Sequence, residues 1–176
     1  MNVMDNPRSR AAAFCERFGL RLPILLAPFW IPEPSPMRDR SHEARVREFL
    51  SRWGPPVPED AGDMALPNFE EQCQALLRIA PAAVSSIMGL YPPSFVGELK
   101  SRRIPWFATA TTVADAKEAE AAGAEVIIAQ GMEAGGHRGA FDATKAEQQL
   151  VGLFALVPAI VDAVSIPVVA AARSFA

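Results

Sequence analysis

Proline at the entrance to an apolar run constrains the fold of this chain more than any other feature. The pattern occurs three times: Leu22-Pro23 precedes ILLAPF, Ile104-Pro105 precedes WFATATT, and Ile166-Pro167 precedes VVAAA. Proline lacks a backbone N–H, and at the first residue of a strand this loss disturbs the hydrogen-bond ladder least. Each run therefore predicts a β-strand that begins next to its proline.

The apolar runs are continuous rather than alternating, and this indicates how the strands pair. Two more runs of the same kind are AAVSSIMG from Ala82 and AEVIIAQG from Ala124. Continuous apolar runs are typical of strands that are buried on both faces, and such strands belong to parallel sheets. The sequence thus predicts five parallel strands, around Ile24, Ala83, Trp106, Val126 and Val168.

Helical segments separate the predicted strands. In TTVADAKEAEAAG, Thr112 is placed to cap the helix, the Asp115 carboxylate lies in the first turn, where negative charge is favourable, and Gly123 suits the carboxyl-terminal cap. NFEEQCQALLRIA has Asn68 as the corresponding cap. Further helices are predicted at Ser9–Gly19 and at Leu150–Val164, the second opened or kinked by Pro158. Alternating strands and helices predict an α/β protein.

One stretch departs from this alternation. Residues 31–67 are rich in proline and charge, and they contain one amphipathic segment at about Ser41–Trp53. We expect a proline-rich surface insertion with one helix, within a single domain that spans residues 1–176. A closed (β/α)8 barrel needs eight strands and about 250 residues. Periodicity alone therefore leaves two architectures open, a small open sheet and a partial barrel.

Composition and charge narrow the class of partner. The chain has 176 residues, of which 50% are hydrophobic and 21% charged, so it can bury a core. A net charge of -3 gives no reason to expect nucleic acid or an anionic membrane surface as a partner, and small molecules are favoured. No secretory signal or run of about 20 apolar residues is evident, and Cys15 and Cys73 read as free thiols. We expect a cytoplasmic protein.

The residues with chemical potential concentrate after the fourth predicted strand, in AQGMEAGGHRGAF. Gln130 lies at the carboxyl end of that strand, where parallel α/β proteins bind ligands. Gly135 and Gly136 let a flat or charged ligand approach the backbone. His137 is either a general base or a structural hydrogen-bonding residue, and its place between Gly136 and Arg138 favours the base.

Other candidate sites are disfavoured. Glu133 and His137 are four residues apart, but no H-E-x-x-H motif exists and His42 is the other histidine of the chain, so we expect no metal site. The paired glycines do not form the G-x-G-x-x-G fingerprint of dinucleotide binding. Cys73 is expected in the core, and the basic residues from Lys100 to Arg103 are expected at the end of a helix.

AQGMEAGGHRG closely resembles the signature of the bacterial nitronate monooxygenases, which are FMN enzymes with a TIM barrel. Three more segments resemble that family: RFGLRLPILLAP, WFATATTVADAKEAEAAGAEVIIAQG and GLFALVPAIVDAVSIPVVAA. The resemblance extends from Phe14 to Ala171. The FMN-dependent enoyl-acyl-carrier-protein reductases share a similar EAGGH core.

The resemblance implies a cofactor, a reaction and a set of site residues. FMN would be the cofactor, and nitronates or nitroalkanes would be oxidised with O2 to carbonyl compounds and nitrite. His137 would be the catalytic base that removes the α-proton of a nitroalkane or orients an ionised nitronate. The residues implied to bind the cofactor are Gln130, Gly131, Gly135, Gly136, Ala27 and Pro28.

The departures from the family pattern imply an incomplete barrel. The family's second and third strands are expected between Pro28 and the PEPSP segment, and its last βα unit after Ala171, yet the sequence has no counterpart of either. We therefore expect a partial TIM-type barrel that lacks about three strands and most of the phosphate site. Its uncovered sheet edges favour self-association. Three functions stay open: an active monooxygenase, an impaired remnant without flavin, and the reductase.

Overall fold

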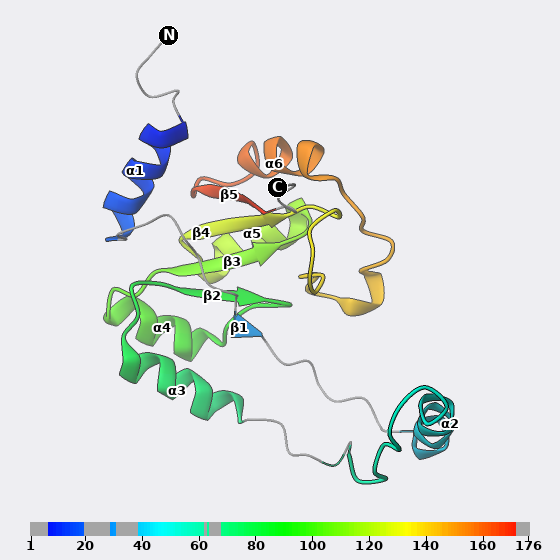
Figure 1. The fold of residues 1–176 in the computed structure, drawn as a ribbon. Helices are drawn as coiled ribbons and strands as arrows, with labels where there is room; N and C mark the ends of the chain where they lie inside the picture. The colour runs from blue at the N-terminus through cyan, green and yellow to red at the C-terminus, as the bar shows by residue number, and fades with distance from the viewer. Residues whose placement is uncertain (1–6, 20–28, 31–38, 62, 64–67, 172–176) are drawn as a thin grey trace.

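A computed structural model describes residues 7–19, 29–30, 39–61, 63 and 68–171 of this chain. Five parallel strands form one sheet in the order β1-β2-β3-β4-β5 (Figure 1). The strands are β1 (Phe29–Trp30), β2 (Val84–Ile87), β3 (Trp106–Ala110), β4 (Val126–Gln130) and β5 (Val168–Ala171). The four later strands confirm the predictions from the apolar runs. The strand predicted around Ile24 lies outside the described residues.

The strand order decides between the two architectures that the sequence left open. Each described strand pairs with its neighbour in sequence, and all pairs are parallel. A doubly wound open sheet reverses its strand order at a switch point, whereas a (β/α) barrel adds its strands one after another. The fold is therefore α/β with parallel βα units of the TIM-barrel type. The five described strands form part of such a barrel, with β1 and β5 at the edges.

Four of the described helices contribute residues to the core beside the sheet, and two of them begin at caps that the sequence predicted. They are α3 (Phe69–Ile79), α4 (Pro93–Ser101), α5 (Val113–Ala122) and α6 (Leu153–Val161). The predicted capping box of α5 is present: the Thr112 side chain accepts a hydrogen bond from the Asp115 N–H, and the Asp115 carboxylate accepts one from the Thr112 N–H. Asn68 caps α3 in a similar way by accepting from the Glu71 N–H. These side chains satisfy donors that the helix itself leaves unpaired.

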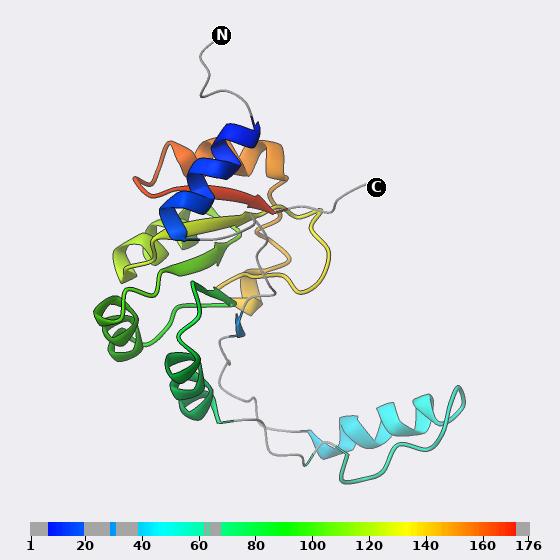
Figure 2. The ribbon, with the colours of Figure 1, turned by 60° about the vertical axis from the view of Figure 1, so that its left-hand side comes forward.

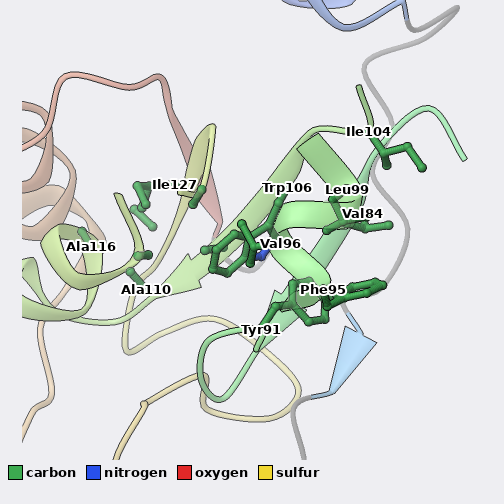
Figure 3. Packing of buried hydrophobic residues seen from close by; sticks show 14 of the residues in the cluster. Val84, Tyr91, Phe95, Val96, Leu99, Ile104, Trp106, Ala110, Ala116 and Ile127 are labelled. Carbon is green, nitrogen blue, oxygen red and sulfur yellow. The ribbon is translucent and has the colours of Figure 1, made fainter. Parts of the chain in front are cut away.

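One face of the sheet packs against these helices. Trp106, Ala108 and Ala110 of β3 alternate with the other residues of that strand and belong to the main hydrophobic core. Figure 3 shows Trp106 beside Val96 and other buried side chains of this cluster. The Trp106 indole N–H donates to the Ser86 hydroxyl at 2.9 Å, so the core buries this polar pair with its hydrogen bond made.

The opposite face of the sheet, called the inner face below, carries Phe107 and Thr109 of β3. Helix α1 (Pro7–Phe18) covers its amino-terminal end. The Phe14 and Phe18 rings lie 5.8 and 5.0 Å from the Phe107 ring, both edge-to-face. Aromatic packing thus fills the inner face at one end of the strands and leaves the carboxyl end to other residues.

Helix α2 (Arg40–Leu50) belongs to the proline-rich stretch at residues 31–67. It lies apart from the sheet in both views (Figures 1 and 2), and none of its residues is buried. Its amino end is capped by Asp39, which accepts from the His42 N–H at 3.0 Å. Within the described ranges, no helix is long and apolar enough to span a membrane.

Candidate functional site

The loop that follows β4 folds back over its own strand, and Gln130 holds it there. Ile127 and Ala129 face the helices, so the alternation of the strand directs Gln130 to the inner face. Its side-chain amide donates to the His137 carbonyl at 2.8 Å and accepts from the Gly139 N–H at 2.7 Å. Gln130 is only 8% exposed. One buried amide therefore fixes the backbone on both sides of Arg138.

Gly139 is a packing residue at the carboxyl ends of three strands. A Cβ atom at this position would lie 3.0 Å from Thr109 Cγ2, 3.1 Å from Ile87 Cγ1 and 3.2 Å from Gln130 Oε1. These side chains come from β3, β2 and β4. The close approach of the loop to all three strands explains why this position carries glycine. The loop thus covers the carboxyl end of the inner face.

The tip of the loop, Gly135 to His137, is exposed. Gly136 has φ +82°, a conformation that favours glycine, and a Cβ at either Gly135 or Gly136 would have no heavy atom of another described segment within 4 Å. The backbone at the tip is therefore accessible to a flat ligand. The Gln130 side chain, at the end of β4, binds the loop that carries the paired glycines and His137, while Ala27 and Pro28 lie outside the described residues.

Three contacts join the foot of the loop to the segment Gln149–Leu153, which leads into α6. The Met132 N–H donates to the Val151 carbonyl at 2.9 Å, and the Arg138 guanidinium donates to the Gln149 carbonyl at 2.6 Å. The Glu133 carboxylate accepts from the Leu153 N–H at 3.0 and 3.2 Å. These contacts of Glu133 and Arg138 were not predicted from the sequence. Their position as charged residues on either side of Ala-Gly-Gly-His was the one available signal.

Hydrogen bonding favours the ionised form of Glu133. The backbone N–H groups of Glu133 itself and of Leu153, with a smaller effect of the Arg138 charge, lower the pKa of this carboxyl group below its usual value. Leu153 is the first residue of α6, where a carboxylate also interacts favourably with the helix dipole. Glu133 is thus a charged cap that joins the loop to the helix.

Gly131 makes room for this junction. A Cβ at Gly131 would lie 2.5 Å from Glu133 Oε2, 2.7 Å from Leu153 Cβ and 2.9 Å from Leu153 N. No real side chain fits at such distances without displacement of a neighbour. Gly131, which the family resemblance assigned to the cofactor, therefore has a packing reason of its own.

A cleft of about 540 Å³ opens at the other end of the sheet. Ala82, Pro105 and Glu125 in its lining each precede a strand, so the cleft lies at the amino ends of β2, β3 and β4. Ligands of parallel α/β proteins bind at the carboxyl ends of the strands, so the histidine loop is the stronger candidate site. Cys73 is 1% exposed in the core, as predicted, and burial together with the Glu70 charge raises the pKa of its thiol to about 11.

A parallel sheet built in sequential order, with its polar loop at the carboxyl ends of the strands, defines a barrel-type α/β protein of the kind that hosts many enzymes. Comparison with known families gives the particular group. The model of the nitronate monooxygenase family matches residues 47–172, and the chain belongs to this family.

Individual relatives agree with the assignment. A probable nitronate monooxygenase from Staphylococcus saprophyticus is 42% identical over 105 residues, which cover 59% of this chain and 30% of that protein. A probable nitronate monooxygenase from Bacillus subtilis is 41% identical over 104 residues, with the same two coverages of 59% and 30%. The chain thus spans about 30% of the length of these curated relatives.

Solved structures share the fold. A nitroalkane oxidase from Streptomyces ansochromogenes superposes with a TM-score of 0.66 at 29% identity, over 81% of this chain and 41% of that one. A FabK variant from Thermotoga maritima gives a TM-score of 0.50 at 28% identity, over 61% of this chain and 32% of that one. Of these two structures, the nitroalkane oxidase has the higher TM-score, and like the family it is named for its action on nitro compounds.

Proposed function

We propose that this chain carries the catalytic loop of an FMN-dependent nitronate monooxygenase. The reaction converts alkyl nitronates to carbonyl compounds and nitrite with O2. The observation that carries the proposal is the exposed tip with His137, held by Gln130 at the carboxyl ends of the parallel strands. Family membership supports the reaction class, because the match to the family includes the whole loop.

The residues at the tip fit a flat cofactor. Gly135 and Gly136 present backbone without neighbouring side chains, so an aromatic ring can approach them closely. The loop engages both the nitrogen and the oxygen of the Gln130 side-chain amide, so we propose that Gln130 supports the cofactor mainly by shaping the loop. Gly131, Ala27 and Pro28 remain part of the proposed cofactor site. FMN, when bound, supplies the electron acceptor for the nitronate and the route to O2.

His137 acts on the substrate as a base. One imidazole nitrogen accepts the α-proton of a neutral nitroalkane, and the electron pair of the broken C–H bond stays on the substrate as a nitronate. A substrate that is already ionised needs no proton transfer, and His137 then only orients it. Gln130 fixes the backbone carbonyl of His137 and so limits where the imidazole can reach.

The substitution His137→Asn tests this assignment. We expect turnover of neutral nitroethane to fall about 10²–10⁴-fold, the usual contribution of a general base, with a much smaller effect on preformed ethyl nitronate. Nitrite release measures both reactions. His42→Asn is the matched control because it changes the other histidine of the chain, which lies on α2 apart from the sheet. Equal losses for the two substrates would remove His137 as the base.

Two other functions are distinguished by simple measurements. The chain spans about 30% of its curated relatives, and an impaired remnant without flavin would show no flavin absorption after reconstitution with FMN. An FMN-dependent enoyl-acyl-carrier-protein reductase would consume NADH, whereas the proposed monooxygenase needs no nicotinamide. We also propose a cytoplasmic location. The sheet edges at β1 and β5 favour self-association, and analytical sedimentation would detect the resulting oligomers.

A further inference from the structure

We propose that Glu133 and Arg138 are positioning residues for His137, and that they act through the segment Gln149–Leu153. The inference rests on the proposed function, since it assigns the residues that hold its catalytic base. Glu133 and Arg138 lie on the two sides of the Ala-Gly-Gly-His tip. Both are bound to the same short segment, which ends at the first residue of α6.

The spacing of the contacts indicates a built support. The backbone groups that the loop contacts belong to every second residue: the Gln149 carbonyl, the Val151 carbonyl and the Leu153 N–H. Backbone groups of alternate residues point to one side of an extended chain, and Gly152 has extended dihedral angles of φ -69° and ψ 146°. The segment thus presents one edge of backbone groups to the loop.

The charges of Glu133 and Arg138 attract each other. Nε and Nη1 of Arg138 are buried and find no hydrogen-bond partner among the described residues, so a nearby negative charge stabilises this cation. Glu133 supplies such charge, because Arg138 contributes to lowering the pKa of its carboxyl group.

The tip needs this support because of its glycines. Gly135 and Gly136 lose more conformational entropy on ordering than other residues would, and their surroundings are open. A tip of this kind holds a histidine in a reactive geometry only when both of its ends are fixed. Gln130 binds the backbone at His137 and Gly139, and the anchors at Glu133 and Arg138 complete the restraint.

A pair of substitutions at Leu153 isolates the Glu133 anchor. Leu153→Pro removes the N–H that donates to the Glu133 carboxylate. Proline suits the first position of a helix, and Gly152 before it already has the extended conformation that a residue preceding proline prefers. Leu153→Ala removes the same side chain and keeps the N–H. Relative to Leu153→Ala, we expect Leu153→Pro to slow the turnover of neutral nitroethane about 10–10²-fold and the turnover of preformed ethyl nitronate less than about threefold. Misplacement of a catalytic group has effects of this size.

A second readout does not depend on turnover. The chain has two histidines, so histidine-selective NMR gives one imidazole signal for His137 and one for His42, which serves as an internal reference on α2. We expect Leu153→Pro to shift and sharpen the His137 signal relative to Leu153→Ala, with His42 unchanged and the circular dichroism of both variants alike. Failure of the unaltered chain to release nitrite would refute the proposed function alone. Identical His137 signals in the two variants would overturn the positioning role.

Discussion

The substitution Gly131→Ala tests whether the loop and α6 meet as described. The new methyl group would stand 2.9 Å from Leu153 N, a backbone atom, and 2.7 Å from Leu153 Cβ. The Glu133 carboxylate, 2.5 Å away, can swing aside, but Leu153 can move only with the start of α6. Overpacking of this kind destabilises proteins by about 1–3 kcal/mol. Gly131 has no positive φ, so the expected effect is steric.

Urea unfolding of Gly131→Ala and Gly135→Ala measures this effect against a matched control. A Cβ at Gly135 meets no heavy atom within 4 Å, and its φ is not positive, so we expect its free energy of unfolding to change by less than about 0.5 kcal/mol. For Gly131→Ala we expect a loss of about 1–3 kcal/mol, or about 2–4 °C in Tm for each kcal/mol. Equal stability of the two variants would refute the packing of the loop foot against α6.

Two further predictions concern titrating groups. Because the pKa of Glu133 is lowered from 4.5, its carboxylate stabilises the fold above pH 4.5, and this contribution is lost as the pH falls through the lowered pKa. The chemical shift of the Leu153 amide, which donates to Glu133, should titrate together with this carboxylate. A titration midpoint of the Leu153 amide at or above pH 4.5 would contradict the hydrogen bond. Burial and the Glu70 charge raise the pKa of Cys73 to about 11, so iodoacetamide at pH 8 should alkylate half-buried Cys15 and spare Cys73 until urea is added. Equal labelling of both thiols in the native protein would place Cys73 outside the core.

Local signals in the sequence predicted most of the described elements. The apolar runs that follow proline predicted β3 and β5, and the Thr112 and Asn68 caps predicted the starts of α5 and α3. These elements were predictable because each signal depends on residues that are close in the chain. Helix α4 is different. Its residues were not predicted to be helical, since it contains Gly97 and begins without a side-chain cap, although its basic carboxyl end was recognised.

The arrangement of the strands and the support of the site needed the structure. Continuous apolar runs indicate parallel strands without giving their order, because pairings between distant segments leave no local pattern. The same holds for Glu133, whose partner is a backbone N–H 20 residues further along the chain. Gln130 was correctly placed at the end of β4, but the sequence could not indicate that its amide holds the loop.

We propose that the histidine loop of this chain works with FMN on nitronates. The most direct test is to reconstitute the purified chain with FMN, remove free flavin, and measure bound flavin and nitrite released from ethyl nitronate in air. We expect about one retained flavin per chain and nitrite equal to the carbonyl product, as the cofactor chemistry requires. A chain that retains no flavin and releases no nitrite would refute this role of the loop.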